Sequence, residues 1–391
     1  MSAPAPAPDR RRIESVDLLR GVIMILMALD HVRDFFGMPG ADPTDLATTT
    51  VPLFFTRWVT HFCAPVFFLL TGTGAYLALA RTTVPQLSRF LLTRGLWLIF
   101  LDLVVLRCFG FQFNFDYRVT LVNVLWALGF AMIALSALVW LPTRLVLALG
   151  IVIVAAHNLL DGVRFASPIW VVLHTPGFLL RTPEHVVFAA YPILPWIGVT
   201  AAGYGLGQVY AWTEARRISF LRNLGLALTA GFVILRLANF YGDPSRFVPQ
   251  STGGMTLVSF LDLQKYPPSL LFLMMTLGPA LIFLSLVDAR TPAILRPAVT
   301  FGKVPMFYFL LHLPLIHGLA ALVCVVRYGS AHWMFESPDL GHFPFTAPPG
   351  WGYPLPVIYA IWIAVVIALY PACRWFAGVK ARRTDLWLSY L

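Results

Sequence analysis

The sequence predicts an all-α, polytopic membrane protein, and three observations lead to that class. Of its 391 residues, 59% are hydrophobic and only 12% are charged, about half the charged fraction of a typical soluble domain. The mean hydropathy is +0.76. Apolar windows of about 20 residues, long enough to cross the hydrocarbon of a bilayer, recur along the chain. Because the alternation typical of a membrane barrel is absent, these windows are predicted to be helices.

About ten membrane-spanning helices are predicted. Their ranges are 17–36, 53–80, 90–110, 120–141, 144–160, 188–211, 219–240, 269–288, 303–326 and 354–375. Together they form a membrane domain over residues 17–375, between a flexible basic segment at 1–16 and a basic tail at 376–391. No polar stretch between the spans is long enough to fold as a separate soluble domain.

The distribution of Lys and Arg predicts that both termini are cytoplasmic. With the N-terminus inside, the cytoplasmic connections collect most basic residues, as the positive-inside rule requires. These residues are Arg10 to Arg12, Arg81, Arg89, Arg94, Arg144, Arg216, Arg217, Arg290, Arg296 and Lys380 to Arg383. The net charge of +10 therefore indicates membrane anchoring and no nucleic-acid partner. The longer loops 161–187, 241–268 and 327–353 fall on the opposite face.

Several kinds of site are excluded by missing motifs. The four cysteines are scattered, so the pattern predicts neither a disulfide framework nor a metal site. There is no Walker A loop and no GxGxxG, so ATP hydrolysis and a bound dinucleotide are not supported. The run GVIMILMAL is not followed by a small-residue cleavage site, which favours a retained signal-anchor helix. The absence of an N-x-[ST] sequon favours a bacterial source, and hence an inner membrane.

The stretch LMALDHVRDFFG, residues 26–37, places ionisable groups on the first apolar helix. At 100° per residue, one stripe of this helix holds Asp17, Arg20, Met24, Met27, His31 and Asp34. Asp30 lies off the stripe. Because adjacent residues on a helix do not face each other, Asp30 and His31 cannot form a simple dyad, and Asp34 at i+3 is the expected partner of His31. Ionisable groups inside a membrane are usually functional.

Arg20 and His31 would lie about 16 Å apart along this helix. A ligand with a charged head and a long arm suits that arrangement, with its head at Arg20 and its reactive end near His31. The alternative is that Asp17 and Arg20 anchor one end of the helix while Arg33 and Asp34 reach the other interface. The sequence leaves both readings open.

Further candidate residues lie on two other predicted spans. His61, in WVTHFCAPVFFLLTGTG, would reach a depth similar to that of His31 if its helix runs antiparallel to the first. In FGKVPMFYFLLHLPLIH, Lys303 marks a cytoplasmic helix start, and Tyr308 and His312 share a face at i and i+4. Lys303, Tyr308 and His312 are candidates for ligand binding, although flanking Lys and aromatic residues are also routine interface anchors. The TGTG motif at 71–74 predicts close helix packing.

Six motifs in order carry a family resemblance over nearly the whole chain. They are RIESVDLLRGVIMILMALDHVRDFF, HFCAPVFFLLTGTGAYLALAR, YPILPWIGV, KYPPSLLFLMMTLGP, FGKVPMFYFLLHLPLIHG and WLSYL. The chain resembles the DUF1624 family of bacterial membrane proteins. That family is similar to the catalytic domain of heparan-α-glucosaminide N-acetyltransferase, within a wider superfamily of transmembrane acyltransferases.

The resemblance implies that a cytoplasmic acyl-CoA, such as acetyl-CoA, donates its acyl group to a sugar amine or hydroxyl at the outer face. His31, with His61, would then be the general base, and Asp34 or Asp30 would orient it. Arg20 and Lys303 would bind the donor's phosphates, either in direct transfer or through an acyl-histidine. The alternative is a proton-coupled transporter or exporter in which Asp30, His31 and His61 form a relay. A homodimer in the lipid bilayer is compatible with either function.

Overall fold

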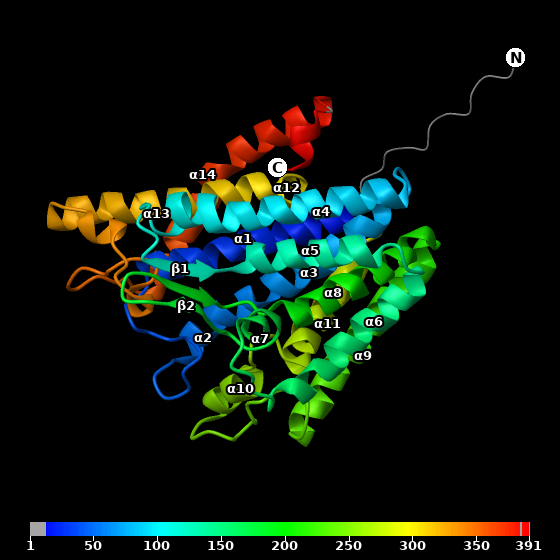
Figure 1. The fold of residues 1–391 in the computed structure, drawn as a ribbon, viewed down its shortest axis with the longest axis horizontal. Coiled ribbons are helices and arrows are strands. Elements are labelled where there is room, and N and C mark those ends of the chain that lie inside the picture. The colour runs from blue at the N-terminus through cyan, green and yellow to red at the C-terminus, as the bar shows by residue number, and fades with distance from the viewer. Residues whose placement is uncertain (1–12, 384, 391) are drawn as a thin grey trace, which may run out of the picture.

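The computed structural model describes residues 13–383 and 385–390, and it confirms a mostly helical chain (Figure 1). The helices are α1 (Glu14–Phe36), α2 (Val51–Trp58), α3 (Cys63–Ala78), α4 (Val84–Phe100), α5 (Val124–Leu138), α6 (Thr143–Ala156), α7 (Pro168–Leu173), α8 (Ile193–Leu206), α9 (Glu214–Ala238), α10 (Gly253–Leu261), α11 (Leu270–Val287), α12 (Arg296–Lys303), α13 (Pro305–Tyr328) and α14 (Leu355–Arg382). Two short helical turns, η1 (Val59–Phe62) and η3 (His157–Leu160), contain His61 and His157. A π-helical segment, η2 (Leu101–Phe111), continues α4.

Six segments of the described chain are long and apolar enough to cross a membrane. They are Val51–Ala78, Thr143–Leu160, Glu214–Ala238, Leu270–Val287, Pro305–Tyr328 and Leu355–Arg382. Each overlaps a predicted span. Of the other four predicted spans, α1 is rich in charged residues, and α5 and α8 have only 15 and 14 residues. The total of about ten and the orientation of the termini remain predictions.

A small three-stranded sheet was not predicted. Strand β1 (Val119–Val122) pairs in parallel with β3 (Val186–Ala189), and β2 (Gly177–Arg181) pairs antiparallel with β3. The predicted helices 120–141 and 188–211 therefore begin too early. The β-branched runs VTLV and VVFA favour extended backbone, and the two helices start only after Asn123 and Pro192.

Helix α1 lies inside the bundle, packed against α3, α12, α13 and α14 (Figure 1). Its closest approach is to α12, where glycines face backbone. A Cβ on Gly21 would overlap the carbonyl of Ala298, and a Cβ on Gly302 would overlap the carbonyl of Asp17. Small residues allow this approach between membrane helices. The contact brings Lys303, at the end of α12, to the same end of α1 as Arg20.

The TGTG motif fulfils its predicted packing role at only one of its glycines. A Cβ on Gly72 would overlap the carbonyl of Thr200 on α8, whereas a Cβ on Gly74 would meet nothing within 4 Å. Gly72 therefore holds α3 against α8, and Gly74 leaves space beside α3.

Gly21→Val is expected to lower the midpoint of thermal unfolding in detergent. The added carbons meet backbone that cannot rotate away, so the cost should reach the upper part of the range of about 1–3 kcal/mol seen for overpacked cores. Gly318→Val on α13 is the matched control, because a Cβ there meets nothing within 4 Å. Equal midpoints for the two variants would show that α1 and α12 do not pack this closely.

Candidate active site

Two cavities border α1, one toward each of its ends. The larger has a volume of about 1260 Å³ and the smaller about 310 Å³. On α1, the larger cavity is lined by Met27, Asp30, His31, Arg33 and Asp34, and the smaller by Arg20 and Met24. The stripe predicted from helical periodicity thus borders both cavities, from Arg20 through to Asp34.

An apolar partition stands where the two cavities meet. Phe67 of α3, Val124 of α5 and Phe309 of α13 line both of them. Three residues from three helices therefore divide a cavity with basic residues at its edge from a cavity that holds histidines and carboxylates. A ligand that reached from one cavity into the other would pass between these side chains.

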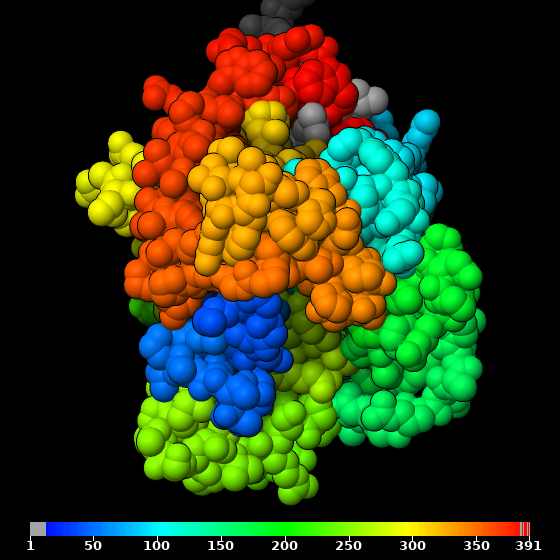
Figure 2. All heavy atoms as spheres, turned by 90° about the vertical axis from the view of Figure 1, so that its left-hand side faces the viewer, coloured from blue at the N-terminus to red at the C-terminus, as the bar shows by residue number. Residues whose placement is uncertain are grey.

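Loops form the rim of the larger cavity. They are residues 37–44 after α1, 262–266 before α11 and 340–354 before α14. Figure 2 shows the face that the blue, lime and orange segments make, hollowed between them. The rim includes the carboxyl group of Asp262. Burial, together with the nearby Asp243, raises the pKa of this carboxyl to about 6.

Asp30 is held by three side chains of α1, α2 and η1. Its Oδ1 accepts hydrogen bonds from Arg33 Nη2 at 2.5 Å and from Thr60 Oγ1 at 3.0 Å, and its Oδ2 accepts one from Arg57 Nη1 at 2.5 Å. These bonds tie α1 to the second predicted span. The carboxylate is thus directed at two arginines and away from His31, as the helical geometry predicts. Asp30 is suited to bracing the helices and less suited to orienting an imidazole.

His31 lies in the larger cavity with its carboxylate partner at a distance. Its Nδ1 is 3.6 Å from Asp34 Oδ2, which is beyond a hydrogen bond. Asp34 itself accepts a hydrogen bond from Arg33 at 3.0 Å. The His31 side chain is 14% exposed, so it is largely shielded and still borders the cavity.

His312 and Tyr308 support His31 from behind. The rings of His31 and His312 are 5.1 Å apart, and Tyr308 stacks in parallel on His312 at 5.4 Å. His312 Nδ1 lies 2.7 Å from the carbonyl oxygen of Phe309. Because a carbonyl only accepts, this nitrogen carries the proton and Nε2 holds the lone pair. The linings of the two cavities include neither Tyr308 nor His312, so their predicted ligand contact is not seen.

His61 reaches the same cavity as His31 from the neighbouring segment. It sits in η1, the turn that interrupts the predicted helix 53–80, and its side chain is 1% exposed. Its ring packs against Phe272 of α11 at 5.3 Å. His61 and His31 both line the larger cavity, and their common depth in the membrane stays a prediction.

Basic residues from four helices line the smaller cavity. They are Arg20 of α1, Arg94 of α4, Lys303 of α12 and Lys380 of α14. Arg20 also donates hydrogen bonds to Asp17 at 3.0 Å and to the Gly302 carbonyl at 3.2 Å, which fixes its guanidinium beside α12. The sequence predicts Arg94 and Lys380 only as membrane anchors, because nothing in the pattern shows that they line one cavity with Arg20.

Three polar residues of the larger cavity were also missed as site residues. Arg57 donates to Asp30 and lies 3.5 Å from the hydroxyl of Tyr266, and the Nζ of Lys265 lies over the Tyr266 ring. Arg57 sits in an otherwise apolar run, and Lys265 and Tyr266 lie just before a predicted span. Lys265 and Tyr266, outside the apolar window, have the position of interface anchors, and only the folded chain brings them beside Arg57.

Residues 12–235 match the family model described as heparan-alpha-glucosaminide N-acetyltransferase, catalytic. The match covers more than half of the chain. The chain belongs to this family. The matched region contains Arg20, Asp30, His31 and His61, and it ends before Lys303 on α12. Membership indicates a membrane acetyltransferase. A comparison with curated proteins finds no matching relative.

Proposed function

We propose that the protein is an integral-membrane acetyltransferase that moves an acetyl group from acetyl-CoA to an amine or hydroxyl of a sugar-type acceptor. The observation that carries this proposal is the arrangement along α1. A cavity edged with basic residues and a cavity that holds His31 meet at one apolar partition. The Arg20 end is the cytoplasmic end in this proposal, and the membrane is the bacterial inner membrane.

The smaller cavity takes the donor. Its volume of about 310 Å³ is at the lower limit of ordinary ligand pockets, so it holds the arm of the coenzyme and leaves the charged head at the mouth. Arg20, Arg94, Lys303 and Lys380 offer cations for the phosphates there. The distance of about 16 Å from Arg20 to His31 is then spanned by the arm, and the thioester arrives at the partition.

The larger cavity takes the acceptor. Its volume of about 1260 Å³ exceeds the usual 300–1,000 Å³ range, which leaves room for a sugar or a longer glycan. Tyr266, Lys265 and Asp262 border this space with hydrogen-bonding groups. These three come from the segment before α11, outside the helices that hold the donor.

His31 acts as the general base in this proposal. It takes the proton from the acceptor amine or hydroxyl as the new bond forms to the thioester carbonyl carbon. The carbon–sulfur bond then breaks, and CoA leaves as a thiolate that is protonated by His31. Asp34, 3.6 Å away, offsets the charge of the imidazolium, and His312 positions the ring. Such assistance typically contributes about 10²- to 10⁴-fold, roughly 3–5 kcal/mol. An acyl-histidine route would use the same residue as a nucleophile.

Equilibrium binding of acetyl-CoA to the purified protein in detergent tests the donor site. Saturable binding that releases free CoA when glucosamine is added would support the proposal. Binding of glucosamine alone, with no binding of acetyl-CoA, would instead favour the transporter alternative, in which no acetyl product forms.

Gly74→Leu is expected to raise the KM for acetyl-CoA at least about tenfold, a loss of about 1.4 kcal/mol of binding, with kcat much less affected. Gly74 lines the smaller cavity, and a Cβ there meets nothing within 4 Å, so the side chain fills the donor's space without straining the protein. Gly318→Leu, on a surface of α13 with equal room, is the control. An unchanged KM in Gly74→Leu would move the donor out of this cavity.

A further inference from the structure

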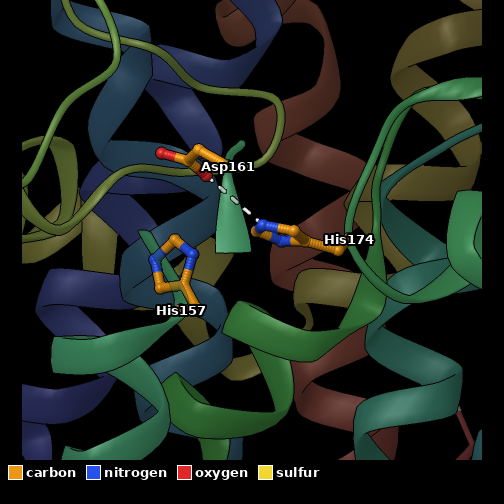
Figure 3. A group of neighbouring side chains, drawn as sticks. All are labelled: His157, Asp161 and His174. Carbon is orange, nitrogen blue, oxygen red and sulfur yellow. Dashed lines mark ion pairs between the residues drawn. The ribbon is translucent and has the colours of Figure 1, made fainter. Parts of the chain in front are cut away.

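A cluster of three side chains lies outside both cavities. His157 begins η3 directly after α6, Asp161 follows one turn later, and His174 comes directly after α7. One donor atom from each residue lies within 4.8 Å of the other two. His174 Nε2 is 3.3 Å from Asp161 Oδ1. Figure 3 shows the three side chains facing a common space.

The two imidazoles are buried and lack hydrogen bonds. His157 is 2% exposed and His174 is 1% exposed. Among the described residues, no ring nitrogen of His157 or His174 has a hydrogen-bond partner, and His174 Nε2 lies beside the Asp161 carboxylate. Most buried polar groups in proteins are satisfied. Two buried rings whose nitrogens lack protein partners, beside one carboxylate, therefore offer lone pairs that can bind a ligand.

A second layer of contacts already orients the carboxylate and one ring. Asn158 Nδ2 donates to Asp161 Oδ2 at 2.8 Å, which leaves Oδ1 turned toward His174. Trp170 packs edge-to-face on His174 with ring centroids 5.3 Å apart. Outer contacts of this kind are typical around metal ligands, where they fix the direction of each donor.

We propose that His157, Asp161 and His174 bind one divalent first-row transition metal ion of the zinc class. Two imidazoles and one carboxylate suit zinc and its neighbours and do not suit magnesium or calcium, which prefer oxygen ligands. Bonds of about 2.1 Å in a tetrahedral site place donor atoms about 3.4 Å apart. The Asp161–His174 pair already has that spacing, and His157 needs only a small movement. A water would complete the coordination.

The ion would act as a clip between distant segments. It would join the end of α6 to the end of α7 and close the loop between Asp161 and His174. Asn158 extends the connection, because its Oδ1 accepts a hydrogen bond from the backbone of Leu270 at 2.8 Å. Leu270 begins α11, and the segment just before it supplies Lys265 and Tyr266 to the larger cavity. The metal would therefore steady one wall of that cavity from outside.

The test is metal loading of the full-length protein in detergent. Protein stripped with a chelator, reloaded with zinc and desalted should retain about one zinc per chain by elemental analysis. His157→Ala and His174→Ala should each lower retained zinc at least tenfold. His342→Ala is the control, because His342 pairs with Asp339 on an exposed loop, with its side chain 52% exposed, and it should retain zinc like wild type.

Cobalt loading gives a second readout, and its first part uses wild-type protein alone. Wild-type protein loaded with Co²⁺ should show visible d–d absorption of a low-symmetry nitrogen and oxygen site, and Asp161→Asn should shift it. A chelator should lower the unfolding midpoint of wild type and leave that of His157→Ala unchanged. Retention of less than about 0.1 zinc per chain by wild type, with no cobalt absorption, would overturn the proposal. Neither readout depends on acetyl transfer.

Discussion

His31→Ala is expected to lower acetyl transfer at saturating acetyl-CoA by about 10²- to 10⁴-fold, the usual contribution of a general base. Binding of acetyl-CoA should stay near the wild-type value, because the basic residues of the donor end lie at the other end of α1, about 16 Å away. The measurement is a single-turnover assay with radiolabelled acetyl-CoA and glucosamine, in parallel with equilibrium binding of the donor. A fall in transfer without a fall in binding places His31 in the chemical step.

Two further variants, His61→Ala and His342→Ala, serve as comparisons for His31→Ala. His61 lines the same cavity, so its loss should slow transfer less than the loss of His31 if it only contacts the acceptor. His342 is an exposed residue of the rim, and its loss should have little effect. Near wild-type transfer by His31→Ala together with a collapse in His61→Ala would reverse the two assignments.

Asp30→Ala is expected to lower the free energy of unfolding by about 3–5 kcal/mol, the cost of leaving a buried charge without its partner. Arg33 and Arg57 both donate to Asp30, and their side chains are 9% and 16% exposed. Removing the carboxylate would leave both guanidinium groups without their main acceptor and would release α1 from α2. The measurement is denaturant or thermal unfolding in detergent.

Asp34→Ala is the matched control for Asp30→Ala. Asp34 is 35% exposed and accepts one hydrogen bond from Arg33, so its loss should cost no more than about 1 kcal/mol, as for surface ion pairs. The double variant Asp30→Ala/Arg57→Leu should recover part of the stability, because one unpaired charge is removed with the carboxylate. If Asp30→Ala kept its stability and lost all transfer, Asp30 would belong to the chemistry and not to the brace.

The part of the site on α1 follows from the sequence because it depends on one helix. The spacing of Arg20, Met24, Met27, His31 and Asp34 sets a common face, and the structure gives that face both cavities. The adjacency of Asp30 and His31 likewise excludes a dyad before any fold is known. These predictions need only the 3.6-residue period of the helix.

The other parts of the site depend on contacts between segments that are distant in the sequence. Two of the three partners of Asp30, Arg57 and Thr60, are 27 and 30 residues away, and His312 reaches His31 from α13. His174 joins His157 only because the chain that follows Asp161 returns to the end of α6. The strands β1 and β3 overlap the starts of two predicted apolar windows, where a short extended run and the start of a helix have similar hydrophobicity.

Proteoliposomes offer the most direct test of acetyl transfer along α1. Purified protein is reconstituted with glucosamine trapped inside, and radiolabelled acetyl-CoA is added outside. The proposal predicts labelled N-acetylglucosamine inside wild-type vesicles, from the molecules whose Arg20 end faces out, and none above background in His31→Ala vesicles. The contradicting result is label that stays on the coenzyme in vesicles of folded wild-type protein. That result would have to hold whether the donor is added outside or trapped inside.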